Sequence, residues 1–168
     1  IQYTSDDKVD RQRFADMDRD IQFFTGETST TVTDARGNPK IFNFHSDTRL
    51  DVTNGGHTFK YEFNDDHLVT KIEFPGGNIV SYNYYPAAEE KRRSAGNLES
   101  VVSIGSDDSI TTTYKYETYW NQVEKIIDPK GNETKITHDG NGNIDTVTLP
   151  GIEQPYDYDY YPPGEPRI

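Results

Sequence analysis

The feature that most constrains the fold of this chain is a tight turn that recurs along it. The turn is clearest in the segment DPKGN at residues 128–132. Asp128 suits the first position of a type I turn, Pro129 presets φ at the second position, and Gly131 takes the positive φ that follows. Such a turn with a G1 bulge joins two antiparallel strands. A chain that repeats it is expected to fold into consecutive β-hairpins.

The turn belongs to a repeat. Counted from the proline, or from Ala35 in the turn at 34–38, Gly-Asn follows at plus two and three, and aromatic or aliphatic residues follow at plus seven and nine. The residues in this frame are Gly37, Asn38, Phe42 and Phe44; Gly77, Asn78, Tyr82 and Tyr84; and Pro129, Gly131, Asn132, Ile136 and His138. In each repeat an aromatic residue, or histidine, stands at the start of a turn. These residues are Tyr3, Phe24, Phe44, Phe63, Tyr84, Tyr116, His138 and Tyr158. Their spacing of about 20 residues, with one longer interval, is typical of a repeat architecture.

The segments between turns read as strands, because they are short and rich in Thr, Tyr, Val and Ile. Residues at plus seven and nine share one face of a strand. The aliphatic residues at minus six and minus three, such as Val123 and Ile126, share a face only if a bulge intervenes. We therefore expect some apolar contact on both faces. Gly142 marks another turn of this series, and Asn54-Gly55 is a two-residue hairpin signal.

Composition narrows the function classes. The net charge of -12 opposes the phosphate neutralisation that nucleic-acid binding requires, so no nucleic-acid partner is expected. The chain has no cysteine, so it has neither disulfides nor a cysteine-ligated metal. No apolar run is long enough to span a membrane. Leu, Ile, Val and Phe make up only about a fifth of the residues, but 12 Tyr and 8 Phe argue for a folded chain with a small aliphatic core.

The segment YKYETYWNQVEKIIDPKGNETKITHDGNGNIDTVTLPG resembles the YD repeats of Rhs proteins. His138-Asp139 and Tyr158-Asp159 occupy the Tyr-Asp slot of that repeat, and Tyr116-Glu117 is a close variant. The resemblance covers nearly the whole chain. It implies a long strip of β-hairpins that, in polymorphic toxins, insecticidal toxin complexes and teneurins, coils into a hollow shell. In the toxins that shell encloses a C-terminal toxin domain.

Other chemistry finds little support in the sequence. Asp16, Asp18, Asp20 and Glu27 are spaced like calcium ligands, but Ile21 stands where the loop needs glycine, so we interpret the match as chance. The four histidines show no metal-ligand spacing, and His138 takes an aromatic slot of the repeat. No nucleophile motif, phosphate-binding loop or distinctive carboxylate pair is present. We expect no enzymatic activity, no metal and no cofactor.

The sequence thus predicts an all-β fold of tandem antiparallel hairpins, forming a spiralling strip that is part of a hollow shell. We expect residues 1–168 to be one repeat segment of about eight units, with an inserted loop at 86–97, cut from a longer secreted or cell-surface protein. Its expected partners are flanking repeats or other chains at the open sheet edges, near Tyr3 and Tyr158, and an enclosed toxin domain. The alternatives are an adhesive repeat protein that binds glycans through Trp120 and the tyrosines, and a scaffold that assembles into filaments.

Overall fold

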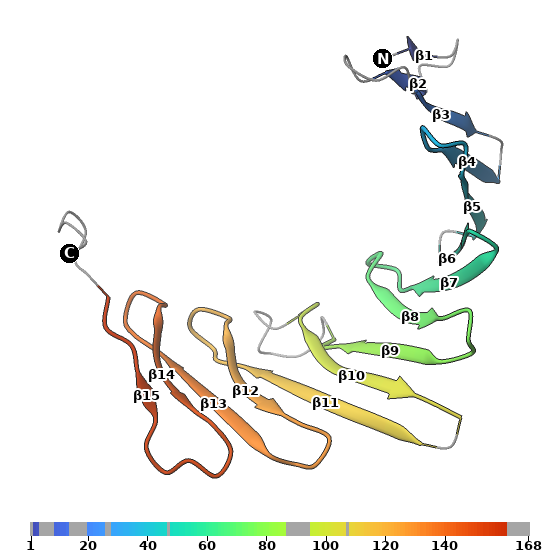
Figure 1. Cartoon of the computed structure of the whole chain (residues 1–168). Coiled ribbons are helices and arrows are strands. Elements are labelled where there is room, and N and C mark those ends of the chain that lie inside the picture. The colour runs from blue at the N-terminus through green and yellow to red at the C-terminus, as the bar shows by residue number, and fades with distance from the viewer. Residues whose placement is uncertain are drawn as a thin grey trace. The chain divides into compact units, whose positions relative to one another are not determined.

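A computed structural model describes residues 2–3, 9–13, 20–25, 28–46, 48–86, 95–106 and 108–160. In these residues fifteen strands form one antiparallel sheet, in which each strand is hydrogen-bonded to its neighbours in the sequence (Figure 1). The described residues contain no helix, and therefore no helix able to cross a membrane. The predicted all-β fold of consecutive hairpins is confirmed. The inserted loop lies mostly outside the described residues, which resume at Ala95.

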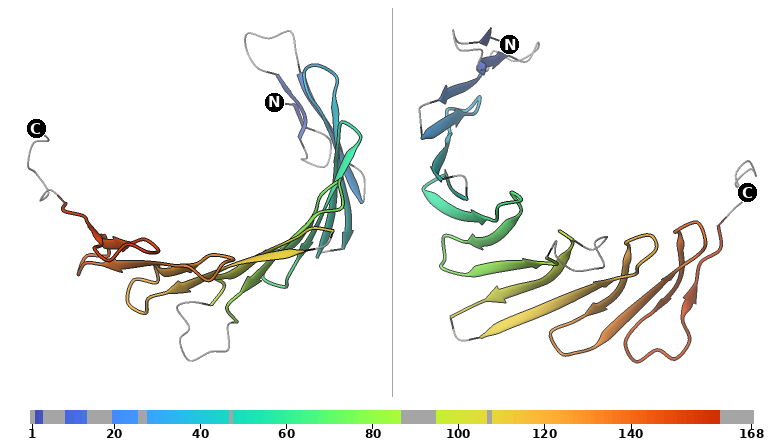
Figure 2. Two further views of the ribbon diagram at one scale, coloured as in Figure 1. Left: turned by 60° about the horizontal axis from the view of Figure 1, so that its bottom comes forward. Right: turned by 180° about the vertical axis from the view of Figure 1, so that it is seen from behind.

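The chain divides into two compact units, Ile1–Ser81 with Ile104–Asp108 and Tyr82–Ser103 with Ser109–Ile168. Within each unit, successive strands lie side by side in both views of Figure 2. The first strands are β1 (Gln2–Tyr3), β2 (Val9–Arg13), β3 (Asp20–Thr25), β4 (Ser29–Thr33), β5 (Pro39–Ser46), β6 (Arg49–Asn54), β7 (His57–Phe63) and β8 (Val69–Glu73). They are followed by β9 (Ile79–Tyr84), β10 (Leu98–Ile104), β11 (Ser109–Tyr116), β12 (Val123–Ile127), β13 (Glu133–His138), β14 (Ile144–Thr148) and β15 (Tyr156–Asp157).

In the first unit, the strand register gathers apolar side chains on one face of the sheet. Phe42, Val52 and Phe59 stand opposite one another on β5, β6 and β7. A second row joins Phe44, Leu50, Tyr61, Ile72 and Val80 on β5 to β9. Residues directly opposite in an antiparallel pair project from the same face and touch. We call the face that carries these eight residues the aromatic face of the first unit.

The opposite face of the first unit carries polar and charged pairs. Lys60 pairs with Glu73 at 2.5 Å, and Lys71 pairs with Glu62 at 3.0 Å, each across neighbouring strands. The hydroxyls of Thr53 and Thr58 lie 2.9 Å apart. Exposed ion pairs of this kind contribute little free energy individually, but opposite charges in register favour this strand alignment over others.

The second unit has the same two kinds of face. One face carries Tyr114, Tyr116, Val123, Ile126, Ile136, His138, Ile144, Val147 and Tyr156, which we call the aromatic face of this unit. The other carries a row of three lysines, Lys115, Lys125 and Lys135, and Lys125 Nζ lies 3.0 Å from a carboxylate oxygen of Glu133. Ile127 also lies on the polar face, so the polar side is not free of apolar groups.

Bulges explain how aliphatic residues three apart share a face. Tyr114 pairs with Ile126 and Tyr116 pairs with Val123, so β12 contains one extra residue, Glu124. The register shifts in the same way at Thr70 in β8 and at Asp145 in β14. An extra residue reverses the alternation of side chains at that point. In all three hairpins a bulge therefore places the two aliphatic residues on the same face, as their spacing in the sequence requires.

Tyrosine hydroxyls tie strands together in the second unit. The hydroxyl of Tyr85 donates to the carbonyl of Tyr114, and that of Tyr116 donates to the carbonyl of Leu98, both at 3.0 Å. The rings of Tyr85 and Tyr116 meet edge to face with centroids 6.1 Å apart. Burial raises the pKa of the Tyr116 hydroxyl. Tyr85 and Tyr116 therefore pack within the sheet.

One layer of strands leaves almost no core. Among the residues whose burial the structure describes, Val52 is the only buried hydrophobic side chain, at 7% exposure. No large side chain is fully buried there. A two-layer domain would bury one whole face of the sheet. In this chain the stability of each hairpin depends on its neighbours instead, as it does in repeat proteins.

We predict that Val52→Ala lowers the free energy of unfolding by about 1.5–2 kcal/mol, because two methyl groups lose their contacts with Phe42 and Phe59. Urea unfolding followed by circular dichroism measures the change. The matched control is Ile110→Ala, because Ile110 is 55% exposed and its truncation should cost less than about 0.5 kcal/mol. Equal losses for both variants would contradict the packing role of Val52.

Candidate functional site

Each repeat turn is closed by two backbone hydrogen bonds, and most are capped by a side-chain oxygen. In the 128–132 turn, the N–H of Gly131 donates to the carbonyl of Asp128 at 2.9 Å, and the N–H of Asp128 donates to the carbonyl of Asn132 at 3.0 Å. The Asp128 side chain accepts hydrogen bonds from the N–H groups of Lys130 and Asn132 and from the Asn132 amide, each at 2.8 Å. Gly131 adopts φ 82°. In this turn one carboxylate thus satisfies three donors.

The same backbone pattern recurs with different caps. Asp34 and Asp139 cap their turns as Asp128 does, and Gly37 and Gly142 adopt φ 85° and 84°. In the 64–68 turn the acceptor is the amide oxygen of Asn64, and His67 takes the positive φ of 60°. The 74–78 turn has both backbone bonds, but Phe74 offers no side-chain acceptor. The carboxylate therefore supports this turn without being required for its shape.

The two-residue hairpin between β6 and β7 is centred one residue later than predicted. Asn54 pairs with His57, so the central residues are Gly55 and Gly56, with φ 58° and 80°. A turn with positive φ at both central positions accepts glycine most readily, and here two glycines are adjacent. Asn54 becomes the last residue of the strand.

Amide donors keep the capping carboxylates ionised. The side-chain amide of Asn132, followed by its backbone N–H, lowers the pKa of Asp128 from its ordinary value of 3.8. Asn38 lowers the pKa of Asp34 in the same way, and Asn143 lowers that of Asp139. Hydrogen bonds to the charged form favour that form. The repeated Asp and Asn thus form one electrostatic unit at each of these turns.

The loop at 117–122 departs from the repeat. Glu117 replaces the aspartate and the loop is one residue longer, with the N–H of Glu117 donating to the carbonyl of Gln122. The Glu117 carboxylate accepts the backbone N–H groups of Tyr119, Trp120 and Gln122 at 2.6–2.9 Å. The N–H of Gln122 is the largest cause that lowers the pKa of Glu117. Asn121 adopts φ 60°, where the repeat places glycine.

Side chains of this loop hold the turn of the next hairpin but one. The Gln122 amide donates to the carbonyl of Gly142 at 2.6 Å. The Trp120 ring lies directly on Gly142, because a Cβ built there would be 2.9 Å from Trp120 Cδ2. On the other side, the Asn97 amide donates to Asn121 Oδ1 at 2.8 Å. Three successive turns at one edge of the second unit are therefore linked by side chains.

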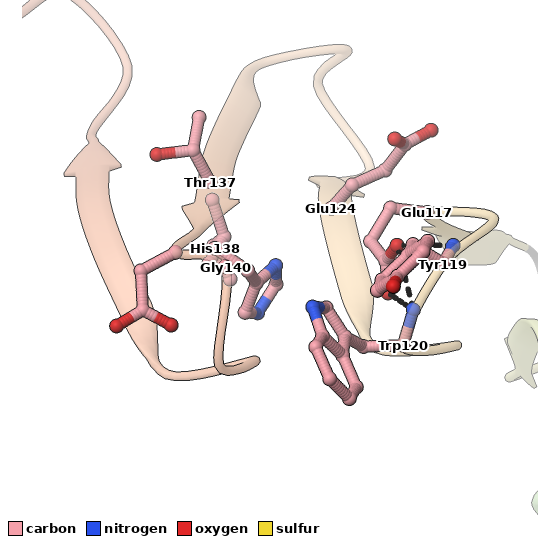
Figure 3. A pocket seen from close by; sticks show the side chains of 9 residues that line it. Glu117, Tyr119, Trp120, Glu124, Thr137, His138 and Gly140 are labelled. Atoms are coloured by element: carbon pink, nitrogen blue, oxygen red, sulfur yellow. Dashed lines mark hydrogen bonds between the residues drawn. The ribbon is translucent and has the colours of Figure 1, made fainter.

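A depression of about 410 Å³ lies between this loop and the end of β13. Its lining consists of Glu117, Tyr119, Trp120, Glu124, Ile136, Thr137, His138, Asp139 and Gly140. We call it the Trp120 depression. Figure 3 shows Trp120 and His138 facing each other across it, with Tyr119 beside Trp120. The rings of Tyr119 and Trp120 meet edge to face with centroids 4.9 Å apart.

The polar groups that line the Trp120 depression differ in whether they already have hydrogen-bond or ion-pair partners. The carboxylates of Glu117 and Asp139 already accept hydrogen bonds from their own loops. In the part of the chain that the structure describes, Glu124 has neither an ion pair nor a hydrogen bond, and the buried Nδ1 of His138 has no partner. Glu124 is the extra residue of its bulge and belongs to the lining of the depression. The depression thus combines one free carboxylate, that of Glu124, with two exposed aromatic rings.

The residues singled out in the sequence occupy three kinds of place. Turns hold Gly37, Asn38, Gly77, Asn78, Pro129, Gly131, Asn132 and Gly142; strands hold Phe42, Phe44, Phe63, Tyr82, Tyr84 and Tyr116; Tyr158 directly follows β15. Of these, none lines the Trp120 depression. The calcium-like spacing lies largely outside the described residues, and no cluster able to hold a metal occurs within them. His45 pairs with Asp51 at 2.9 Å.

Sequence reasoning missed the roles of Glu117 and Gln122. A signal was present, because Glu117 follows the aromatic residue of the repeat and stands where aspartate is usual. The four residues that follow it contain the only tryptophan of the chain and an asparagine suited to positive φ. What the sequence does not contain is the register that brings His138 to the same place.

No family model matches this chain, and no curated protein matches it significantly. The functional argument therefore depends on the turns, the two faces and the Trp120 depression.

We predict a pH-dependent effect of Asp128→Asn. The folded pKa of Asp128 lies below the unfolded value, so its contribution to stability is complete above that value of about 3.8 and is lost as the pH falls through the folded pKa. The substitution should therefore destabilise the protein at pH 6 and much less at pH 2.5. The introduced amide can still accept the turn N–H groups, as Asn64 does in its own turn.

Thermal unfolding of both proteins at the two pH values measures this difference. Asp65→Asn is the matched control, because it removes the same charge at the tip of a turn where Asn64 is the acceptor. A melting-temperature difference for Asp128→Asn that is the same at pH 6 and pH 2.5 would show that its carboxylate charge does not stabilise the turn.

We predict that Gly142→Ala is more destabilising than Gly131→Ala. Both glycines have nearly the same positive φ, which costs an L-residue about 1–2 kcal/mol. Only at Gly142 would the new Cβ also strike a ring, since nothing lies within 4 Å at Gly131. The additional cost should be about 1 kcal/mol or more. Chemical denaturation gives both values, and the emission of Trp120 should shift only in Gly142→Ala.

Proposed function

We propose that this chain is a structural segment of an Rhs-type β-shell in a large secreted or cell-surface protein. In that role it forms part of a wall that encloses or presents another domain, which in the toxin members of the family is a toxin domain. The single observation that carries the proposal is a sheet of consecutive hairpins in one layer, with a different chemistry on each face.

The near absence of a core in the residues with described burial supports a wall rather than an independent domain. A globular domain buries the apolar side of its sheet against a second layer. Here the aromatic faces of both units stay partly exposed, and Val52 alone is buried among the hydrophobic residues with described burial. A wall in a larger protein would have its aromatic face covered by what it encloses or by other parts of that protein.

The repeated turn supports a sheet that continues beyond this segment. Each hairpin is closed by its own hydrogen bonds and pairs only with its neighbours. Nothing in this pattern limits the number of hairpins, because every unit offers the next one the same edge. A wall of any length can be made from such units, and its open edges are the places where further chain would pair.

The edge of β15 gives a direct test of this proposal. The N–H of Tyr158 donates inward to the carbonyl of Asp145, so the N–H of Asp157 points outward. We predict that the isolated chain self-associates, and more strongly in high salt, because salt screens its net charge of -12. Light scattering at low and high salt measures the association.

Asp157→Pro should reduce the association, because it removes an outward N–H and keeps the inward bond. Tyr158→Pro is the matched control, since it removes the inward bond and should loosen β15 without blocking the outer N–H. Growth into long fibres visible by electron microscopy would favour the filament alternative. A strictly monomeric chain that unfolds cooperatively in both salt conditions would overturn the proposal in favour of an independent β domain.

A further inference from the structure

We propose that the Trp120 depression binds a cationic organic group, namely the guanidinium or ammonium group of a basic peptide side chain. This inference concerns one local site in the second unit, and it does not depend on the shell proposal. It is carried by the charge of the lining, by the two exposed rings and by the groups that the fold leaves without partners.

The charge of the lining selects a cation. Glu117, Glu124 and Asp139 contribute three carboxylates, and the nine lining residues include neither lysine nor arginine. Hydrogen bonds from their own loops keep Glu117 and Asp139 ionised. These two carboxylates contribute a negative field, although their own loops already occupy them. A concave site with walls of one sign concentrates ligands of the opposite charge.

Glu124 is the carboxylate available to pair with such a ligand. Three other glutamates on the strands have lysine partners, since Glu62 pairs with Lys71, Glu73 with Lys60 and Glu133 with Lys125. Glu124 has no such partner among the described residues. It lines the depression, so a ligand there can pair with it without displacing an existing bond.

The aromatic rings suit the same ligand. Tyr119 is 69% exposed and Trp120 is 40% exposed, and the two are held edge to face. Cations are attracted to the faces of such rings, with tryptophan the best of the aromatic residues. Glu117 fixes both residues by accepting their backbone N–H groups. The backbone that carries the two rings is therefore held in place, which lowers the entropy cost of binding.

The size of the depression fits a side chain better than a whole molecule. A volume of about 410 Å³ lies near the low end of ligand sites. A guanidinium group has five N–H donors to offer to the carboxylates of the lining.

The only tryptophan of the chain lies in this site and reports on it directly. Acetyl-Gly-Arg-Gly-amide is titrated into the protein while Trp120 emission is followed. The same peptide with citrulline, which is nearly isosteric and neutral, is the matched control. We expect a saturable change with the arginine peptide, a much smaller one with citrulline, and weaker arginine binding in high salt.

Variants test the residues assigned. Glu124→Gln should weaken binding of the arginine peptide about fivefold, and Tyr119→Leu should weaken it by a similar factor. Glu153→Gln removes the same charge from the β14–β15 loop and should change the dissociation constant less than about twofold. Circular dichroism confirms that each variant is folded, which is expected because neither the Glu124 nor the Tyr119 side chain accepts or donates a hydrogen bond in the described structure.

Three results would overturn the inference. One is no saturable change with the arginine peptide, and another is equal binding of the arginine and citrulline peptides. The third is binding of neutral oligosaccharides that is insensitive to salt and to Glu124→Gln but lost in Tyr119→Leu, which would identify a carbohydrate site. Each of these results leaves the light-scattering test of the shell proposal unaffected.

Discussion

The backbone hydrogen-bond pair that closes each repeat turn is the interaction on which the rest of the structure depends. Because one N–H donates back across three residues and one carbonyl accepts across four, the two strands leave every such turn in the same register. Register decides which side chains share a face, and a slip of one residue would exchange the two faces completely. The capping carboxylates of Asp34, Asp128 and Asp139 reinforce this pair, and the turn at Phe74 shows that the backbone bonds suffice for the geometry.

A bulge in each of three hairpins completes the separation of the faces. The turn alone would place aliphatic residues three apart on opposite sides of the sheet. The extra residue, which is Thr70, Glu124 or Asp145, returns both to the aromatic face opposite two aromatic or aliphatic partners. This arrangement gives the described strands of each unit an apolar side without a helix or a second sheet. It also explains why so few aliphatic residues are enough for the chain to fold, since cross-strand pairs rather than a closed core stabilise it.

How well each feature can be predicted depends on how far apart in the sequence the residues that determine it lie. The glycine positions, the strands around them and the hairpin order follow from four or five adjacent residues, and the sequence predicted them. The hairpin at Gly55 was predicted one residue too early, because two adjacent glycines offer two possible centres. From the sequence a bulge could be stated only as the condition under which aliphatic residues three apart share a face. Its presence depends on how two strands pair, which the sequence alone does not show. The Trp120 depression was not predicted, because it depends on contacts between residues about 20 positions apart, such as Gln122 with Gly142.

The loop at 117–122 shows how a repeat protein can acquire a site without losing its register. Glutamate has one more methylene group than aspartate, so Glu117 reaches the N–H groups of a loop that is one residue longer. The turn keeps its closing function, and the added length turns Tyr119 and Trp120 outward. Trp120 uses its contact with Gly142 to fix the neighbouring turn, and only a residue without a Cβ leaves room for the ring there. The repeat requires Gly142 for its backbone conformation, and the same glycine leaves the space that the Trp120 ring occupies. The loop that departs from the repeat therefore depends on a residue that the repeat supplies.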